Sequence, residues 1–173
     1  TDRKSPVLDF PAWNVNGICQ VDNIPYTYCI TSLSQLLKDA GYHTIHCGKA
    51  HWGAVDTPGE NPHHFGFEVN IAGHAGGGVA SYLGTNNFGN RTDGKPSPLQ
   101  AVPGLKEYWG KDIFLTEALT LEALKALDKA KNLGQPFYLY LSHYAVHIPI
   151  DRDKRFYSKY LEAGLSEKEA GYA

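Results

Sequence analysis

The sequence contains no methionine, and only three of its 173 residues are cysteine. Three cysteines are too few, and odd in number, for a disulfide framework, and none of them lies in a C-x-x-C pair. No apolar run approaches the length of a membrane span, so the sequence predicts no contact with a membrane. Basic residues are not in excess, since 16 Lys and Arg against 18 Asp and Glu give a net charge of −2. This balance argues against a partner that is a nucleic acid or an anionic lipid.

The composition is that of a globular domain, with 42% hydrophobic residues and enough length for one sizeable core. The chain begins at Thr1 without a start residue. It ends soon after Ser166 and Glu169, whose S-x-x-E spacing is a capping box that announces a helix. We therefore expect an internal piece of a longer protein; the alternative is a processed N-terminus with a frayed natural C-terminus.

Helix, strand and loop occur twice in that order. The first helix is predicted over Ser32–Ala40 and the first strand over Tyr42–Cys47. Residues 48–110 read mostly as loop, a length that is often functional. A long helix over Asp112–Asn132 and a strand over Pro136–Ser142 follow. The repeated order predicts an α/β layered domain, with the two strands parallel and close neighbours in one sheet and the long helix packed on a face.

Several finer expectations accompany these elements. Thr31 is the expected cap of the first helix, and Gly41 and Gly134 are the expected stops. The second strand is almost continuously apolar, which is typical of a strand buried on both faces. The apolar positions expected to pack are Leu33, Leu36 and Leu37 in the first helix, and Ile113, Leu119, Leu121, Leu124 and Leu127 in the second.

Basic side chains follow both predicted strands. Lys49 and His51 come after the first strand, and His143 and His147 come after the second. Ligands of open α/β sheets bind outside the carboxyl ends of the strands, so we expect these residues to face one crevice. We expect the tips of Lys49, His51 and His147 to lie within about 10 Å, the span of a small anion and its contacts.

The loop CGKAHWG has no acid that could neutralise its lysine. A lysine is a point charge with three donors, which suits an anionic substrate whose charge grows in the transition state. The glycines on both sides, Gly48 and Gly53, let the backbone turn sharply and approach an anion. A histidine can donate a proton to a leaving oxygen near neutral pH.

Three stretches resemble segments of the type I sulfatases, in that family's order and from about Ser32 to Pro149. LLKDAGYHTIHCGKAHWG is similar to L-x-x-x-G-Y-x-T-x-x-x-G-K-x-H-x-G, and PFYLYLSHYAVHIPI resembles the strand that leads to a histidine before x-Pro. HHFGFEVNIAGHAGGG is similar to the G-F-D segment between them, with Glu68 in place of Asp. The matching residues are Leu37, Gly41, Tyr42, Thr44, Gly48, Lys49, His51, Gly53, His147, Ile148 and Pro149.

The resemblance implies an alkaline-phosphatase-like fold, a large mixed sheet sandwiched by helices, here in part. It implies hydrolysis of sulfate monoesters by a formylglycine nucleophile, with a bound calcium. In the family's pattern Lys49 contacts the sulfate and the formylglycine hydrate, His51 bonds that hydrate, and His147 contacts the sulfate and the leaving oxygen. We also assign His74 and His143 to the substrate site. The expected partner is a small-molecule or glycan sulfate ester, and the expected location is periplasmic or secreted.

The chain departs from the family's pattern in what it lacks. It has no C/S-x-P/A-x-R motif, no D-D calcium pair and no D-N-G run. Residues 1–173 are therefore expected to form a partial catalytic domain without the nucleophile segment and the C-terminal part, inactive alone. Position 50 is Ala where Trp is frequent, and Trp52 stands where Leu is frequent.

Alternatives stay open from the residues alone. One is a metal-dependent phosphodiesterase or phosphatase of the same superfamily, and another is a non-catalytic module that binds sulfated glycans. His143 and His147 are four residues apart, which on a helix would suit zinc, although the β-like run and Pro149 disfavour a helix there. GHAGGG reads as a flexible loop because it lacks the G-K-[ST] of a phosphate loop. His63 and His64 read as solvated loop residues.

Overall fold

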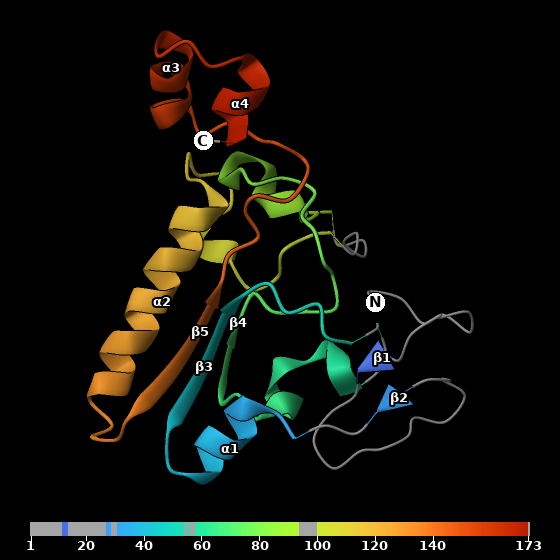
Figure 1. The fold of residues 1–173 in the computed structure, drawn as a ribbon, viewed down its shortest axis with the longest axis vertical. Helices are drawn as coiled ribbons and strands as arrows, with labels where there is room; N and C mark the ends of the chain where they lie inside the picture. The colour runs from blue at the N-terminus through green and yellow to red at the C-terminus, as the bar shows by residue number, and fades with distance from the viewer. Residues whose placement is uncertain are drawn as a thin grey trace.

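A computed structural model describes residues 31–53, 55, 58–93 and 100–172, together with 12–13 and 27–28. Its centre is a three-stranded sheet in the order β4-β3-β5, in which both pairings are parallel. The strands are β3 (His43–Gly48), β4 (Val69–Ile71) and β5 (Phe137–Ser142). Figure 1 shows helix α2 (Leu115–Lys131) running alongside the sheet.

The remaining elements surround this sheet or extend from it. They are the parallel pair β1 (Ala12–Trp13) and β2 (Thr27–Tyr28), the helices α1 (Leu33–Asp39), α3 (Lys154–Glu162) and α4 (Glu167–Tyr172), and short 3₁₀ segments at Pro58–Glu60, Pro62–Phe65, Gly84–Gly89 and Lys106–Tyr108. In Figure 1, α3 and α4 lie together beyond one end of the sheet, and α1 lies near the other end. Within the described ranges, no helix combines the length and the apolar character that crossing a bilayer requires.

The two strands expected to be parallel neighbours are paired directly. β3 and β5 run in register from His43 opposite Phe137 to Gly48 opposite Ser142. The expectation that the long helix packs on a face of the sheet is also confirmed, because Leu119 and Ala123 of α2 share a core cluster with Cys47. The α/β reading of the sequence is therefore correct for the described residues.

The two faces of the sheet carry different side chains, as the period of two along a strand requires. Ile45 and Cys47 of β3 are fully buried on the face that α2 covers. Thr44 and His46 are fully buried on the opposite face, where aromatic side chains surround His46. These aromatics are Trp52, Phe67 and Tyr140.

Helix α2 packs on the sheet with small residues, and here the sequence-based expectation was partly wrong. Leu119 is buried as expected, but Leu121 and Leu124 are exposed, Leu124 to 53%. The buried positions of the helix include four alanines, Ala118, Ala123, Ala126 and Ala130. An alanine face brings the helix axis close to the sheet, and the larger leucines then point away from it.

Two further expectations need correction. Ser32, not Thr31, caps α1: the Ser32 hydroxyl accepts a hydrogen bond from the Gln35 amide at 3.2 Å. Leu33 and Leu36 of that helix are exposed rather than packed. Strand β5 is not buried on both faces, because within the described residues it has β3 as its one neighbour and Phe137 is 46% exposed.

The region expected to be mostly loop contains real structure. Residues 69–71 form β4, which pairs with β3, and several 3₁₀ turns punctuate the rest. The capping box near the C-terminus is confirmed. The Ser166 hydroxyl lies 2.6 Å from the Glu169 carboxylate, and the Glu169 amide donates back to that hydroxyl at 3.3 Å, at the start of α4.

Gly48 allows the closest backbone approach at the end of the β3–β5 pair, so its replacement should be costly. An added Cβ would meet the Ser142 carbonyl oxygen at 1.9 Å, and φ at Gly48 is +109°. We expect Gly48→Ala to lower the free energy of unfolding by about 3 kcal/mol or more, from backbone strain and overpacking together. Equilibrium unfolding in urea measures this change.

The control is Gly41→Ala, because Gly41 also has positive φ (+88°) but no atom within 4 Å of an added Cβ. This variant should cost only about 1–2 kcal/mol, the strain of a left-handed residue with a side chain. Equal losses in the two variants would contradict the close approach of Gly48 to Ser142.

Candidate functional site

Lys49 leaves the sheet at the carboxyl end of β3, beside the end of β5. Its backbone amide donates a hydrogen bond of 2.7 Å to the Ser142 carbonyl, directly after the tight contact at Gly48. The side chain is half-buried, and it forms no ion pair with any acid of the described residues. A lysine charge that no acid neutralises at the edge of a sheet is suited to an anionic ligand.

His51 sits in a strained backbone conformation two residues later. Its φ is +59°, in the left-handed region that residues with side chains rarely adopt. The His51 amide donates to the His74 carbonyl at 3.1 Å, which ties the loop after β3 to the loop after β4. The imidazole lies against Gly77, where an added Cβ would come within 2.3 Å of the ring. Strain of this kind persists where the surroundings hold the residue, and it gathers at functional sites.

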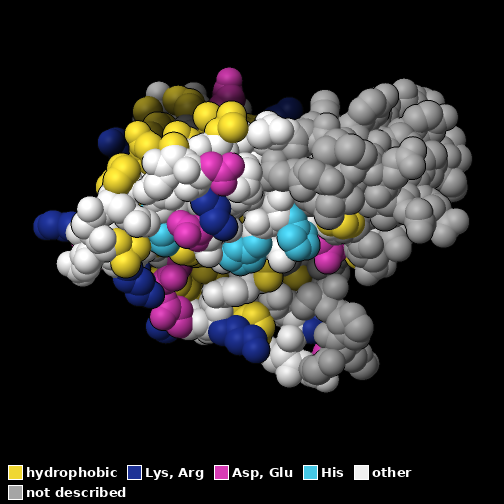
Figure 2. All heavy atoms as spheres, turned by 90° about the horizontal axis from the view of Figure 1, so that it is seen from below, with side chains coloured by type: hydrophobic (Ala, Val, Ile, Leu, Met, Phe, Trp, Pro, Cys, Tyr) yellow, Lys and Arg dark blue, Asp and Glu magenta, His cyan; other side chains and the backbone are white. Residues whose placement is uncertain are grey.

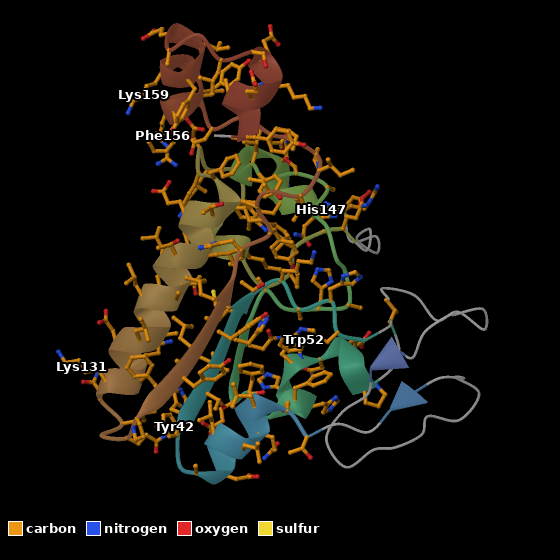
Figure 3. The ribbon with its side chains drawn as sticks, in the orientation of Figure 1. Tyr42, Trp52, Lys131, His147, Phe156 and Lys159 are labelled. Atoms are coloured by element: carbon orange, nitrogen blue, oxygen red, sulfur yellow. The ribbon has the colours of Figure 1, made fainter. Side chains whose placement is uncertain are left out.

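His147 follows β5, and its side chain packs next to the glycine that contacts His51. Its ring lies against Gly78, at 3.0 Å from an ideal Cβ at that position. The side chain is exposed, with Nδ1 2.7 Å from the Ile148 carbonyl. Figure 3 shows His147 toward the end of the sheet where the strands finish, and Tyr42 near the opposite end.

The glycine segment 76–78 ends the GHAGGG stretch, which was predicted to be a flexible loop. All three residues are buried. The rings of His51 and His147 lie against consecutive positions, Gly77 and Gly78, whose Cα atoms are about 3.8 Å apart. Two histidines almost a hundred residues apart in sequence therefore share one wall. Both rings pack directly on the segment, since an added Cβ would lie 2.3 Å from the His51 ring at Gly77 and 3.0 Å from the His147 ring at Gly78.

A buried tyrosine holds the backbone of His147. The Tyr82 hydroxyl accepts from the His147 amide at 3.0 Å and lies 2.8 Å from the Tyr144 carbonyl and 2.9 Å from that of His147. The Tyr82 ring stacks on Phe114 with centroids 5.3 Å apart. Asp151 fixes the next part of the chain by accepting from the Tyr82 amide at 2.7 Å. The turn that carries His147 is thus anchored on both sides.

His74 and His143, the two other residues assigned to the substrate site, are both partly buried. Burial, and then the nearby charge of His51, lowers the pKa of His74, and burial also lowers the pKa of His143. The Gly76 amide donates to His74 Nδ1 at 3.1 Å, so a neutral ring carries its proton on Nε2. Within the described ranges His74 Nε2 and His143 Nδ1 are buried without a partner.

Two hollows adjoin these histidines. One of about 240 Å³ opens beside His147 and is lined by Tyr82, Phe114 and Tyr157 among others. Another, of about 520 Å³, lies beside His74 and includes His63 in its wall. His63 and His64 are exposed, as expected of loop residues, and Figure 2 shows histidine side chains at the surface next to acidic and basic ones.

Other residues that the sequence singled out have structural roles. Cys47 is fully buried, its thiol lies 3.4 Å from the Leu119 carbonyl, and burial raises its pKa to about 12, so it is not poised as a nucleophile. The Glu68 carboxylate lies 3.0 Å from His43 Nδ1 and accepts from the Thr44 amide. Trp52 packs with Phe67 and other aromatics on the sheet face opposite α2.

Among the described residues, His143 and His147 do not belong to a group of three or more metal-ligand side chains. Residues 144–147 run through a turn after β5, not a helix, and in the described part of the chain no three His, Cys, Asp or Glu side chains gather as a metal site would require. Calcium therefore stays an expectation from the family resemblance, and we assign no residue to it.

Sequence reasoning missed two residues that hold the site. Tyr82 was not singled out, since a tyrosine in a glycine-rich loop carries no motif. His46 was also missed, although its place in an otherwise apolar strand, between Ile45 and Cys47, could have marked it. A buried polar side chain in a strand requires hydrogen-bond partners, and those partners identify what it positions.

The parallel sheet, the helices around it and the loops at its carboxyl edge define an α/β fold of the alkaline-phosphatase type. A sequence model of the family described as "Sulfatase" matches residues 10–169, so the chain belongs to the sulfatase family. It is 30% identical to the uncharacterized sulfatase YdeN of Escherichia coli, over 88% of this chain and 28% of that protein. It is 29% identical to an arylsulfatase of Klebsiella aerogenes, over 80% of this chain and 29% of that protein.

A solved structure has a similar fold. The crystal structure of Ps i-CgsB superposes with a TM-score of 0.59 at 25% identity, covering 94% of this chain and 36% of that one. The chain spans less than a third of the length of the curated relatives it matches. The resemblance expected from the three sequence stretches is confirmed at the level of family and fold.

Tyr82 offers a test of how the His147 turn is held. Tyr82→Phe keeps the ring that stacks on Phe114 but removes the hydroxyl at the three backbone groups. Because buried backbone groups lose a partner, we expect the free energy of unfolding to fall by about 1–3 kcal/mol. Urea unfolding of the variant measures this loss.

Tyr140→Phe is the matched control, because the structure gives its hydroxyl no hydrogen bond to a described residue and the side chain is 39% exposed. It should change stability by less than about 0.5 kcal/mol. If the Tyr82→Phe variant is as stable as this control, the hydroxyl does not anchor the turn.

Proposed function

We propose that this chain supplies the sulfate-contacting part of a sulfatase that hydrolyses sulfate monoesters, with Lys49, His51 and His147 at the reacting group. The observation that carries the proposal is the shared glycine wall. Two histidines from the loops after β3 and β5 lie against consecutive glycines. A lysine without a described acid partner leaves the sheet at the same edge. Such an edge is where α/β sheets bind ligands. Membership of the sulfatase family supports the nature of the ligand.

The roles follow from the chemistry of a sulfate ester. The sulfate group is an anion, and the leaving oxygen gains negative charge as its bond to sulfur breaks. Lys49 places a fixed positive charge against the sulfate oxygens, in a half-buried position that strengthens the interaction. His147, which is exposed beside a 240 Å³ hollow, is placed to give a proton to the leaving oxygen, and the hollow can receive the rest of the ester.

His74 and His143 complete the proposed substrate site. With Nδ1 of His74 occupied by the Gly76 amide, the Nε2–H of a neutral ring is a donor that lacks a described acceptor. A substrate hydroxyl or sulfate oxygen would supply one. In this family the nucleophile is a formylglycine, which would take up the sulfate group. The sequence lacks the motif for that residue, so its segment is proposed to lie elsewhere in the full-length protein.

Lys49 provides the first test of the proposal. In the full-length protein, Lys49→Ala should lower the turnover of 4-nitrophenyl sulfate by about 10²- to 10³-fold, the usual loss for one charge-stabilising donor. Lys131→Ala is the matched control, since Lys131 is exposed at the end of α2 and lies far from His147 in Figure 3. A Lys49→Ala protein that keeps its rate would remove the basis of the proposal.

His147 provides the second test, through the leaving group. The substrates are aryl sulfates that range from nitrophenyl esters, whose phenolate departs without help, to phenyl sulfate, whose oxygen needs a proton. We expect His147→Ala to slow phenyl sulfate by at least about tenfold more than 4-nitrophenyl sulfate. The measurement is kcat/KM across the series.

His43→Ala serves as the control, because His43 begins β3 at the opposite end from Lys49 and pairs with Glu68. It should lower all the rates equally or not at all. If His147→Ala also gives the same loss with every leaving group, His147 is not the proton donor.

A further inference from the structure

His46 is a buried histidine that contacts the backbone of Lys49 in the candidate site. The side chain is fully inaccessible to solvent in the middle of β3. Its Nε2 lies 3.2 Å from the Lys49 carbonyl oxygen, and its Nδ1 lies 3.1 Å from Asn70 Oδ1. The ring therefore joins the loop after β3 to β4, whose middle residue is Asn70.

The orientation of the Asn70 amide is fixed by backbone groups. Asn70 Nδ2 donates to the Gly73 carbonyl at 2.9 Å, and Oδ1 accepts from the Gly73 amide at 3.1 Å. Since a backbone amide only donates and a carbonyl only accepts, the amide cannot be flipped. His46 thus faces an acceptor at each ring nitrogen. Burial lowers the pKa of His46 to about 4, so a ring with one N–H serves one of these acceptors at neutral pH.

The two acceptors differ in whether another donor already serves them. Asn70 Oδ1 already accepts the Gly73 amide, whereas the Lys49 carbonyl has no other donor within the described residues. The contact with the Lys49 carbonyl is part-buried, and a carbonyl that loses its donor there costs free energy. We therefore assign the proton of the neutral ring to Nε2, toward Lys49. The Lys49 amide is already bonded to the Ser142 carbonyl at 2.7 Å. Both polar backbone groups of Lys49 are then held, while its charged side chain has no acid partner among the described residues.

The ring itself is held in place by packing. Trp52 and Phe67 meet it edge-on, with centroids 5.0 Å and 5.4 Å away, and Tyr140 stacks on it at 5.7 Å. On the remaining side is Gly73, where an added Cβ would come within 2.5 Å of the ring. A ring confined in this way can place its Nε2 in one position only, which is what a supporting residue needs.

We infer that His46 is a positioning residue for Lys49, which it aligns for the sulfate group through a hydrogen bond from Nε2 to the Lys49 backbone carbonyl. This inference rests on the proposed function, since it acts through Lys49. Loss of the bond would let the loop shift, and a shift of about 1 Å at a reacting group can cost on the order of 100-fold in rate. We expect a loss of kcat of about 10- to 100-fold, with KM changed by less than about threefold.

Two conservative variants separate the two contacts of the ring. The amide nitrogen of His46→Gln can reach the position of Nε2, and that of His46→Asn can reach the position of Nδ1. In the full-length protein, His46→Gln should keep kcat for 4-nitrophenyl sulfate within about threefold of wild type, and His46→Asn should show the full loss. His46→Phe, which keeps the aromatic packing and loses both contacts, should resemble His46→Asn if it folds. Each kcat is divided by the folded fraction of the variant, which its urea unfolding curve gives. A loss of stability alone then does not lower the reported kcat.

A double variant links the effect to Lys49. On top of Lys49→Ala, His46→Asn should lower kcat by less than about threefold, because residues that act through one another are not additive. Equal rates for the Gln and Asn variants, or a full additional loss in the double variant, would overturn the inference. If Lys49→Ala itself keeps its rate, the proposed function fails. If Lys49→Ala loses its rate while every His46 variant keeps it, only the positioning role of His46 fails.

Discussion

The parallel pairing of β3 with β5 is the constraint on which the site depends. It continues to the last residue of both strands, where Gly48 lies opposite Ser142. At that point a side chain on Gly48 would collide with the Ser142 carbonyl, and the same carbonyl accepts the Lys49 amide. The end of one strand therefore fixes where the other strand's loop begins. Because parallel strands finish at the same edge, both loops with basic side chains leave from one place.

The glycine segment 76–78 forms the wall against which the two histidine rings of the candidate site pack. Gly77 and Gly78 come from the long region between the two strands, and each one gives room to a different imidazole. A side chain at Gly77 would displace the His51 ring, and one at Gly78 would be in tight contact with the His147 ring. Tyr82 and Asp151 then hold the far side of the His147 turn through backbone contacts.

The sequence predicted the elements with strong periodicity and missed those determined by tertiary contacts. Both long strands and the long helix were found, because their apolar patterns are local signals. The three-residue strand β4 was missed, since Val69–Ile71 is stabilised by pairing with β3 and carries no pattern of its own length. The buried face of α2 was misjudged because leucine was expected inside, whereas the close approach to the sheet selects alanine.

The site residues show the same division. Lys49, His51 and His147 were predicted because their spacing resembles a family pattern. The sequence does not predict that the rings of His51 and His147 pack against Gly77 and Gly78, because these contacts join loops that are distant in the chain. His46 and Tyr82 escaped notice for a related reason. Each acts through backbone groups of another residue, and backbone groups leave no trace in a sequence.

Departures from ordinary structure gather around these loops. His51 and Ala72 have φ values of +59° and +63°, which residues with side chains rarely adopt, and the fully buried His46 lies among aromatic rings. Each of these features destabilises the fold relative to an apolar residue in a relaxed conformation. The cost of the strained backbone is on the order of 1–3 kcal/mol. The hydrogen bonds of His46 to the Lys49 carbonyl, and of His51 to that of His74, offset part of this cost. Strained backbone is not confined to these loops, because Asn87 and Phe88 in the 3₁₀ segment Gly84–Gly89 also have positive φ. At the carboxyl edge of the sheet, however, strain at His51 and a buried polar ring at His46 occur beside Lys49, which has no acid partner among the described residues. Strain and buried polar groups that coincide in this way are expected where function constrains the chain.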